Sequence, residues 1–181
     1  MYLLVHVPAR FQDWQARYEL SNGLLSHGQM LPGRVARFKR LHTVVPNGFD
    51  QSNGNDYADR MYTVRVEDDF AAAHFLARYH GKCEKLHGHN YKVFVTAAGT
   101  KLDNGGMLLD FGIMKEALRA VIKEVDHTSL NDHPAFADGC PSAERIAQFI
   151  YDRMHTALPQ ARFTLVEVFE TDRNRATYSP D

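Results

Sequence analysis

The chain has 181 residues, of which 44% are hydrophobic and 24% are charged, as expected for a single globular domain with a sizeable core. Its formal net charge is −1, which argues against the basic surface that a nucleic-acid or membrane partner would require. No apolar run reaches the about 18 residues of a membrane span, and two cysteines make no disulfide framework, so we expect a cytoplasmic protein.

Residues 1–60 are expected to form an N-terminal extension of unknown role. Most of this segment shows only loose strand and helix patterns. Residues 46–59 are rich in Pro, Gly, Asn, Asp and Ser, which is typical of a flexible linker. Patterning becomes clear at Met61, so we expect the folded domain to cover residues 61–181.

Two antiparallel strands are predicted at the start of this domain. Residues 62–67 alternate apolar and polar side chains, the pattern of a half-buried strand. Residues 90–98 show the same alternation and are the expected partner. A polar loop over residues 78–84 lies between them and carries Cys83.

Two helices and two further strands follow. Asp110 can cap a helix over residues 111–125, and Ser142 can cap a second helix. Alternation then predicts strands over residues 162–170 and 176–178. This order predicts an α+β fold, with an antiparallel four-stranded sheet and both helices packed on one face.

A candidate metal site lies around His87 and His89. Side chains two apart on a strand point to the same face, so both imidazoles can reach one ion. His74 could supply a third nitrogen from the neighbouring strand. Three histidines around Zn²⁺ leave one tetrahedral position open, as in catalytic sites. Cys83, four residues before His87, is a candidate nucleophile or base.

The spacing allows a second interpretation of the same residues. A closed structural zinc site could use Cys83, His87, His89 and Cys140. In that case the protein would be a non-catalytic, zinc-stabilised binding module.

Six short motifs occur in order after residue 61. They are Phe70-Ala-Ala-Ala-His74, Cys83-x-x-x-His87-Gly-His89-Asn90, Leu109-Asp110-Phe111, Val125-Asp126-His127-x-x-Leu130-Asn131-Asp132, Pro141-Ser142-Ala143-Glu144 and Val168-Phe169-Glu170-Thr171. Each motif alone is weak, but together they are specific. Through them the segment 61–181 resembles the 6-pyruvoyl-tetrahydropterin synthase and 6-carboxy-tetrahydropterin synthase family, which adopts the tunnelling (T-) fold.

The resemblance implies the catalytic roles. The zinc ligands would be His74, His87 and His89. Cys83 would be the catalytic thiol, able to take a proton from the substrate side chain. Asp126 and His127 would form a proton-relay pair that approaches the thiol from an adjacent subunit. Without the resemblance, a histidine at the end of a helix is simply favourable.

The resemblance also implies the substrate contacts and the assembly. Glu170 would anchor the guanidine-like edge of the pterin through charge-assisted hydrogen bonds. Ser142 and Glu144 fall in a polar motif beside the pterin pocket. Members of the family form homohexamers or related rings, so we expect an oligomeric barrel with shared active sites.

The implied substrate is 7,8-dihydroneopterin triphosphate. The three residues between Cys83 and His87 resemble the 6-carboxy-tetrahydropterin synthases of the queuosine (7-deazaguanine) route, which release triphosphate and acetaldehyde. The sequences His-Gly-His-Asn-Tyr-Lys-Val and Phe-Glu-Thr-Asp-Arg-Asn are closer to the pyruvoyl-forming branch of tetrahydrobiopterin synthesis. A third branch has Glu in place of the Cys and feeds folate synthesis, and Glu84 keeps that activity open. We favour the carboxy-forming lyase.

Overall fold

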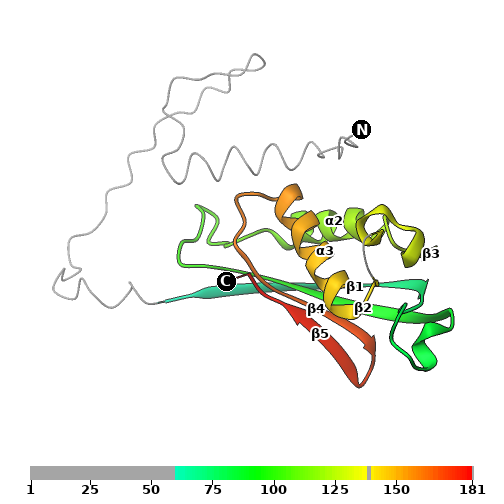
Figure 1. Ribbon diagram of the computed structural model, residues 1–181. Helices are drawn as coiled ribbons and strands as arrows, with labels where there is room; N and C mark the ends of the chain where they lie inside the picture. The colour runs from blue at the N-terminus through cyan, green and yellow to red at the C-terminus, as the bar shows by residue number, and fades with distance from the viewer. Residues whose placement is uncertain (1–59, 138–139, 181) are drawn as a thin grey trace, which may run out of the picture.

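The protein is described by a computed structural model that covers residues 60–137 and 140–180. Its strands are β1 (Tyr62–His74), β2 (His87–Gly99), β3 (Thr128–Ser129), β4 (Phe163–Thr171) and β5 (Asn174–Tyr178). Its α-helices are α2 (Phe111–Ile122) and α3 (Ala143–Ala157), and short 3₁₀ helices are η1 (Lys82–Glu84), η2 (Leu130–Asp132) and η3 (Pro134–Phe136). Both α-helices cover the same face of the sheet, which confirms the predicted α+β arrangement (Figure 1).

The sheet has five strands in the order β3-β1-β2-β4-β5, so the prediction of four strands was wrong. The four predicted strands are present and pair antiparallel, but β3 pairs parallel with β1 and makes the sheet mixed. β3 has two residues, too few for a period-two pattern to be visible in the sequence. It exists because Thr128 and Ser129 meet Ala72 and Ala73 across the fold.

The strands β1 and β2 are longer than predicted. β1 continues beyond the predicted residues 62–67 to His74, so His74 lies on the first strand. β2 begins at His87, three residues earlier than expected. The two strands pair along their whole lengths, from Tyr62 opposite Gly99 to His74 opposite His87.

The helix α2 is capped as predicted. The Asp110 carboxylate accepts hydrogen bonds from the backbone N–H groups of Gly112 (2.6 Å) and Ile113 (3.2 Å). The helix ends at Ile122, earlier than the predicted Val125, because the following residues form tighter turns. Val125 is nevertheless fully buried in the core.

The helix α3 begins directly after Ser142, which occupies the N-cap position. Its hydroxyl makes no capping hydrogen bond, so the predicted side-chain cap was wrong. Glu144 lies in the first turn, where a negative charge is favourable.

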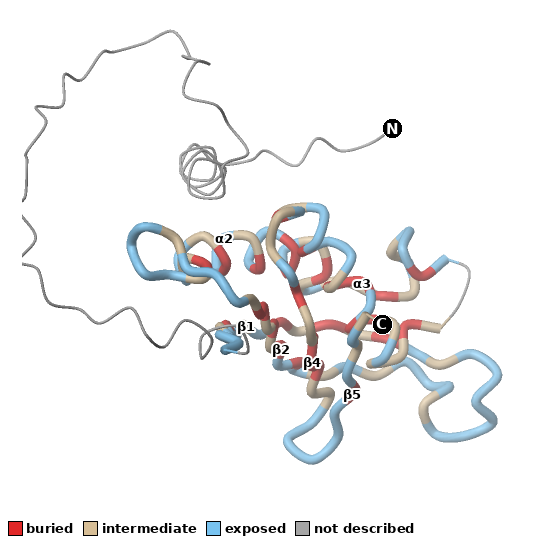
Figure 2. The backbone as a smooth tube through the Cα atoms, turned by 90° about the vertical axis from the view of Figure 1, so that its left-hand side faces the viewer, coloured by how far each residue is buried: buried red, intermediate tan, exposed pale blue. Residues whose placement is uncertain are grey.

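One hydrophobic core lies between the helices and the sheet. The apolar stripes of both helices pack onto the central strands, and removing this surface from water is the main stabilising contribution. Its members include Tyr91, Val93, Val95, Met114, Leu118, Val121, Ile146, Ile150, Met154, Val166 and Val168. Figure 2 marks the buried positions along strands and helices, with exposed residues gathered in the connecting loops.

Two predictions concern residues that lie outside this description. The N-terminal extension of residues 1–60 falls there except for Arg60, and so does the linker at residues 46–59.

In residues 60–137 and 140–180, no helix has the length and apolar character needed to cross a membrane.

Candidate metal centre

The predicted histidine cluster forms at the paired ends of β1 and β2. His74 and His87 are direct partners in the antiparallel register. His89, two residues further along β2, lies on the same face of the strand. One ligand atom from each imidazole lies within 4.8 Å of the others, so the three side chains could hold one metal ion.

Backbone carbonyl groups fix two of the imidazoles. The Nδ1 atom of His74 lies 2.8 Å from the Pro141 carbonyl oxygen, and Nδ1 of His87 lies 2.7 Å from that of Lys85. A carbonyl oxygen only accepts, so each Nδ1 carries the proton and donates. Each Nε2 then carries the lone pair that a metal ligand needs.

The surroundings of these nitrogens fit a cation such as Zn²⁺. The Nε2 atoms of His74 and His89 are buried and have no hydrogen-bond partner. Glu170 Oε1 lies 3.2 Å and 3.6 Å from them, at ion-pair distance but without hydrogen-bond geometry. The lone pairs of the two imidazoles and the carboxylate oxygen repel each other at this distance unless a positive charge lies between them.

Burial lowers the pKa of His89, and the neighbouring His74 and His87 lower it further, while Glu170 opposes this shift. A lowered pKa favours the neutral imidazole near pH 7. The neutral form is the one that binds a metal ion.

The predicted relay pair is in contact. Asp126 Oδ1 lies 2.8 Å from Nδ1 of His127 and accepts a hydrogen bond from the Ala71 N–H at 3.0 Å. The backbone N–H of His127 donates to the Ala71 carbonyl at 2.6 Å. The Ala71 N–H and then the His127 side chain lower the pKa of Asp126, so the carboxylate stays ionised.

His127 and His89 line the same open groove of about 520 Å³, beside the β1–β2 pair. The His127 side chain is 81% exposed, so its imidazole is accessible from outside the chain. Cys83 is absent from the residues that line this groove.

Cys83 lies in η1, in the loop between β1 and β2. Its carbonyl accepts a hydrogen bond from the Leu76 N–H at 2.8 Å. Cys140 Sγ donates to the Ala77 carbonyl at 3.1 Å. Among the described residues, the group of potential metal ligands contains the three histidines and neither cysteine. The closed Cys83, His87, His89 and Cys140 site is therefore not assembled.

Ser142 and Glu144 follow Pro141, whose carbonyl holds His74. The start of α3 is thus attached to the metal cluster through one hydrogen bond. Because Ser142 makes no cap bond, its hydroxyl remains available to another partner.

Sequence reasoning missed the carbonyl groups of Lys85 and Pro141 as supports of the cluster. No sequence signal could have found them, because every residue carries a carbonyl group.

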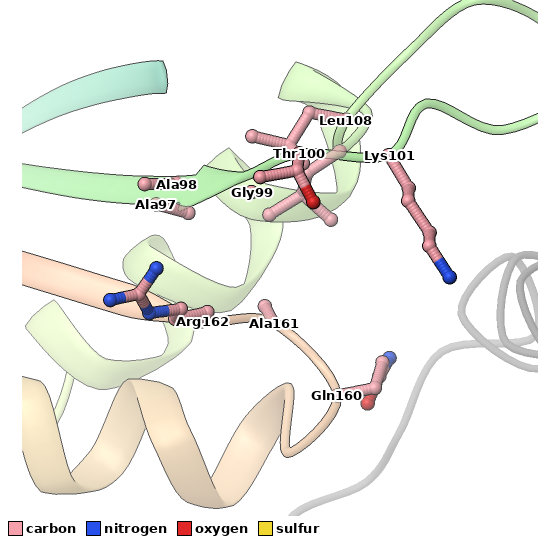
Figure 3. Close-up of a pocket in the computed structure, with 10 residues that line it drawn as sticks. Ala97, Ala98, Gly99, Thr100, Lys101, Leu108, Gln160, Ala161 and Arg162 are labelled. Atoms are coloured by element: carbon pink, nitrogen blue, oxygen red, sulfur yellow. The ribbon is translucent and has the colours of Figure 1, made fainter. Parts of the chain in front are cut away.

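A second pocket, of about 260 Å³, lies at the other end of β2 around Gly99, Lys101 and Arg162 (Figure 3). It contains none of the predicted site residues.

Comparisons with known proteins identify the family of the chain. A family model described as 6-pyruvoyl tetrahydropterin synthase matches residues 63–181. The 6-carboxy-5,6,7,8-tetrahydropterin synthase of Bacillus subtilis (strain 168) is 35% identical over 134 residues, which cover 68% of this chain and 90% of that protein. The 6-pyruvoyl tetrahydrobiopterin synthase of Poecilia reticulata is 36% identical over 143 residues, covering 71% and 97%.

A solved structure shows the same fold. The 6-pyruvoyl tetrahydropterin synthase of Caenorhabditis elegans has a TM-score of 0.62 and 27% sequence identity, and the match covers 67% of this chain and 97% of that one. The residues that the family model matches contain all six motifs. The chain belongs to the 6-pyruvoyl tetrahydropterin synthase family.

Proposed function

We propose that this chain is a zinc-dependent lyase that converts 7,8-dihydroneopterin triphosphate and water to 6-carboxy-5,6,7,8-tetrahydropterin, with loss of triphosphate and acetaldehyde. The observation that carries the proposal is the cluster of three imidazoles beside the Glu170 carboxylate. A relative named for the carboxy product supports the choice of reaction. The product would enter the queuosine (7-deazaguanine) route, and we place the enzyme in the cytoplasm.

His74, His87 and His89 would hold the zinc ion through Nε2, with a coordination position left for substrate. Bound there, zinc would supply a Lewis acid next to the side-chain hydroxyls of the pterin. The Pro141 and Lys85 carbonyls would keep two of the imidazoles in the ligating tautomer.

Cys83 would act as the base that takes a proton from the substrate side chain, and the Asp126–His127 pair would return one. The Asp126 carboxylate supports this role because it can accept a hydrogen bond from Nδ1–H of His127, which leaves Nε2 free to exchange a proton. The high exposure of His127 supports its delivery to the thiol of a neighbouring copy.

Glu170 would bind the amino and N–H groups of the pterin ring with its carboxylate. Its position beside the cluster supports this role, because a pterin held there has its side chain near the metal. Ser142 and Glu144, next to the Pro141 contact, would add polar contacts to the same pocket.

The active protein would be a homo-oligomer, a hexamer or a related ring, with barrel-like closure of the sheets. The free edge of β1 supports this assembly. Among the described residues, β3 pairs only with Ala72 and Ala73 on that side, and the Ala71 backbone bonds to Asp126 and His127. Tyr62 to Phe70 therefore have no strand partner there. Such an edge is a template for a strand of another copy.

A second candidate is the 6-pyruvoyl tetrahydropterin synthase reaction, favoured by the 36% identical Poecilia reticulata relative. Mass analysis of the products from purified protein, zinc and 7,8-dihydroneopterin triphosphate separates the candidates. We expect 6-carboxy-tetrahydropterin and acetaldehyde. A pyruvoyl product would support the second candidate, and a hydroxymethyl-dihydropterin would indicate the folate branch. No turnover at full zinc occupancy would contradict all three and favour a non-catalytic zinc-binding module.

A further inference from the structure

The side chain of Asn131 makes two hydrogen bonds to the backbone of Phe75. Its Oδ1 accepts from the Phe75 N–H at 2.8 Å, and its Nδ2 donates to the Phe75 carbonyl at 2.9 Å. A primary amide offers the same donor and acceptor pair as a peptide group. Asn131 therefore pairs with Phe75 as a strand residue would.

The register of the sheet explains why a side chain is needed there. β3 pairs with β1 as Ala72 to Thr128 and Ala73 to Ser129. Continued by two residues, this parallel register would place Phe75 opposite Asn131. The chain instead turns into η2 at Leu130, so its backbone no longer pairs with β1. The side-chain amide of Asn131 makes the hydrogen bonds to Phe75 in its place.

Phe75 lies between two parts of the proposed active site. On one side is the metal ligand His74. On the other side is Leu76, whose N–H donates to the Cys83 carbonyl at 2.8 Å and closes the loop that carries the thiol. A residue that holds the Phe75 backbone therefore fixes the positions of both neighbours, the ligand His74 and the loop that carries Cys83.

We propose that Asn131 is a positioning residue, which sets the place of the Cys83 loop relative to the His74, His87 and His89 cluster. Both of its side-chain hydrogen bonds go to the Phe75 backbone, and it acts through that residue. The proposal deepens the proposed function and rests on it for its catalytic consequence, but its effects on the metal and on the thiol are independent of any reaction.

The test compares Asn131→Ala, which removes both hydrogen bonds, with Asn131→Asp, which keeps the acceptor for the Phe75 N–H and loses the donor. Asn104→Ala, in the turn before α2, is the matched control. Each purified full-length protein is measured for zinc affinity against a chelator, for the alkylation rate of Cys83 by peptide mass analysis, and for kcat and KM.

For Asn131→Ala we expect zinc affinity to fall by about 10- to 100-fold, the usual effect of removing a group that orients a ligand. We also expect faster alkylation of Cys83 and a lower kcat with little change in KM. Asn131→Asp should lie between Asn131→Ala and the wild type, and Asn104→Ala should match the wild type.

The proposal would be overturned if both folded variants kept a zinc affinity and a Cys83 alkylation rate within about twofold of the wild type. A lower melting temperature would not change this outcome, because by itself it indicates a merely structural role. If Asn131→Ala does not fold, Asn131→Asp decides by the same criterion. A wild type without turnover, combined with weaker zinc binding in the variants, would contradict the proposed function and still support the positioning role.

Discussion

The His74 imidazole donates a hydrogen bond to the Pro141 carbonyl across a sequence separation of 67 residues. This contact joins the metal cluster on the sheet to the residue that precedes the N-cap of α3. It also places the Ser142 and Glu144 motif beside the candidate metal centre. One hydrogen bond thus links the residues proposed for metal binding to those proposed for pterin binding.

Replacing His89 should remove the metal. In His89→Ala two imidazoles remain, and two ligands from the protein are fewer than the three of a typical catalytic zinc site. We expect zinc content per chain, measured by elemental analysis after dialysis, to fall to a small fraction of the wild-type value. His155→Ala, on an exposed part of α3, should keep its zinc. Equal zinc content in both variants would contradict the assignment of His89.

Replacing Cys83 should separate a catalytic from a structural role. In Cys83→Ala we expect unchanged zinc content and an unchanged melting temperature, because the thiol lies outside the ligand group. Turnover should fall by roughly 10²- to 10⁴-fold, the usual contribution of a general base. Cys140→Ser keeps a donor for the Ala77 carbonyl and is the control for thiol loss. Loss of zinc and of stability in Cys83→Ala would instead support the closed structural zinc site of Cys83, His87, His89 and Cys140.

Replacing Glu170 should weaken substrate binding. Glu170→Gln removes the charge that would strengthen hydrogen bonds to the pterin, and such bonds contribute about 1.5–3 kcal/mol. We expect KM to rise by roughly one to two orders of magnitude.

The control for this change is Glu167→Gln on the same strand. Side chains three residues apart on a strand point to opposite faces, and Glu167 pairs there with Arg65 and Arg175. Glu167→Gln should lower the melting temperature and leave KM near the wild-type value. A similar rise of KM in both variants would argue against a specific pterin contact at Glu170.

The Asp126 carboxylate should make stability depend on pH. Folding lowers its pKa through the Ala71 N–H and His127, so the ionised group stabilises the fold above the unfolded-state pKa of about 3.9. This contribution is lost as the pH falls through the lower, folded-state pKa. Asp126→Asn still accepts a hydrogen bond from Ala71 but does not titrate. Melting temperatures measured from about pH 5 downward should therefore fall more steeply for the wild type. Parallel curves for the two proteins would contradict the assignment.

Local patterns in the sequence predicted most of the secondary structure. Alternation over residues 62–67 and 90–98 identified the two long strands, because one face of each is buried against the helices. The Asp110 cap was also predictable, since the residues that it bonds lie two and three positions ahead. β3 was not, because two residues that pair with a distant strand carry no local signal.

By itself, the sequence determined which donor groups are present and that the three histidines belong to one site. The two-residue spacing of His87 and His89 is visible in the sequence, and the ordered motifs added His74. The strands predicted from alternation did not reach these residues, so their pairing became clear only in the structure. Only the tertiary structure decided the tautomers of His74 and His87, the approach of Glu170 to the cluster and the amide pairing of Asn131 with Phe75. Apart from the nearby Lys85 carbonyl that holds His87, these contacts join residues far apart in the chain. Their geometry is set by packing and sheet register, which a local pattern does not contain.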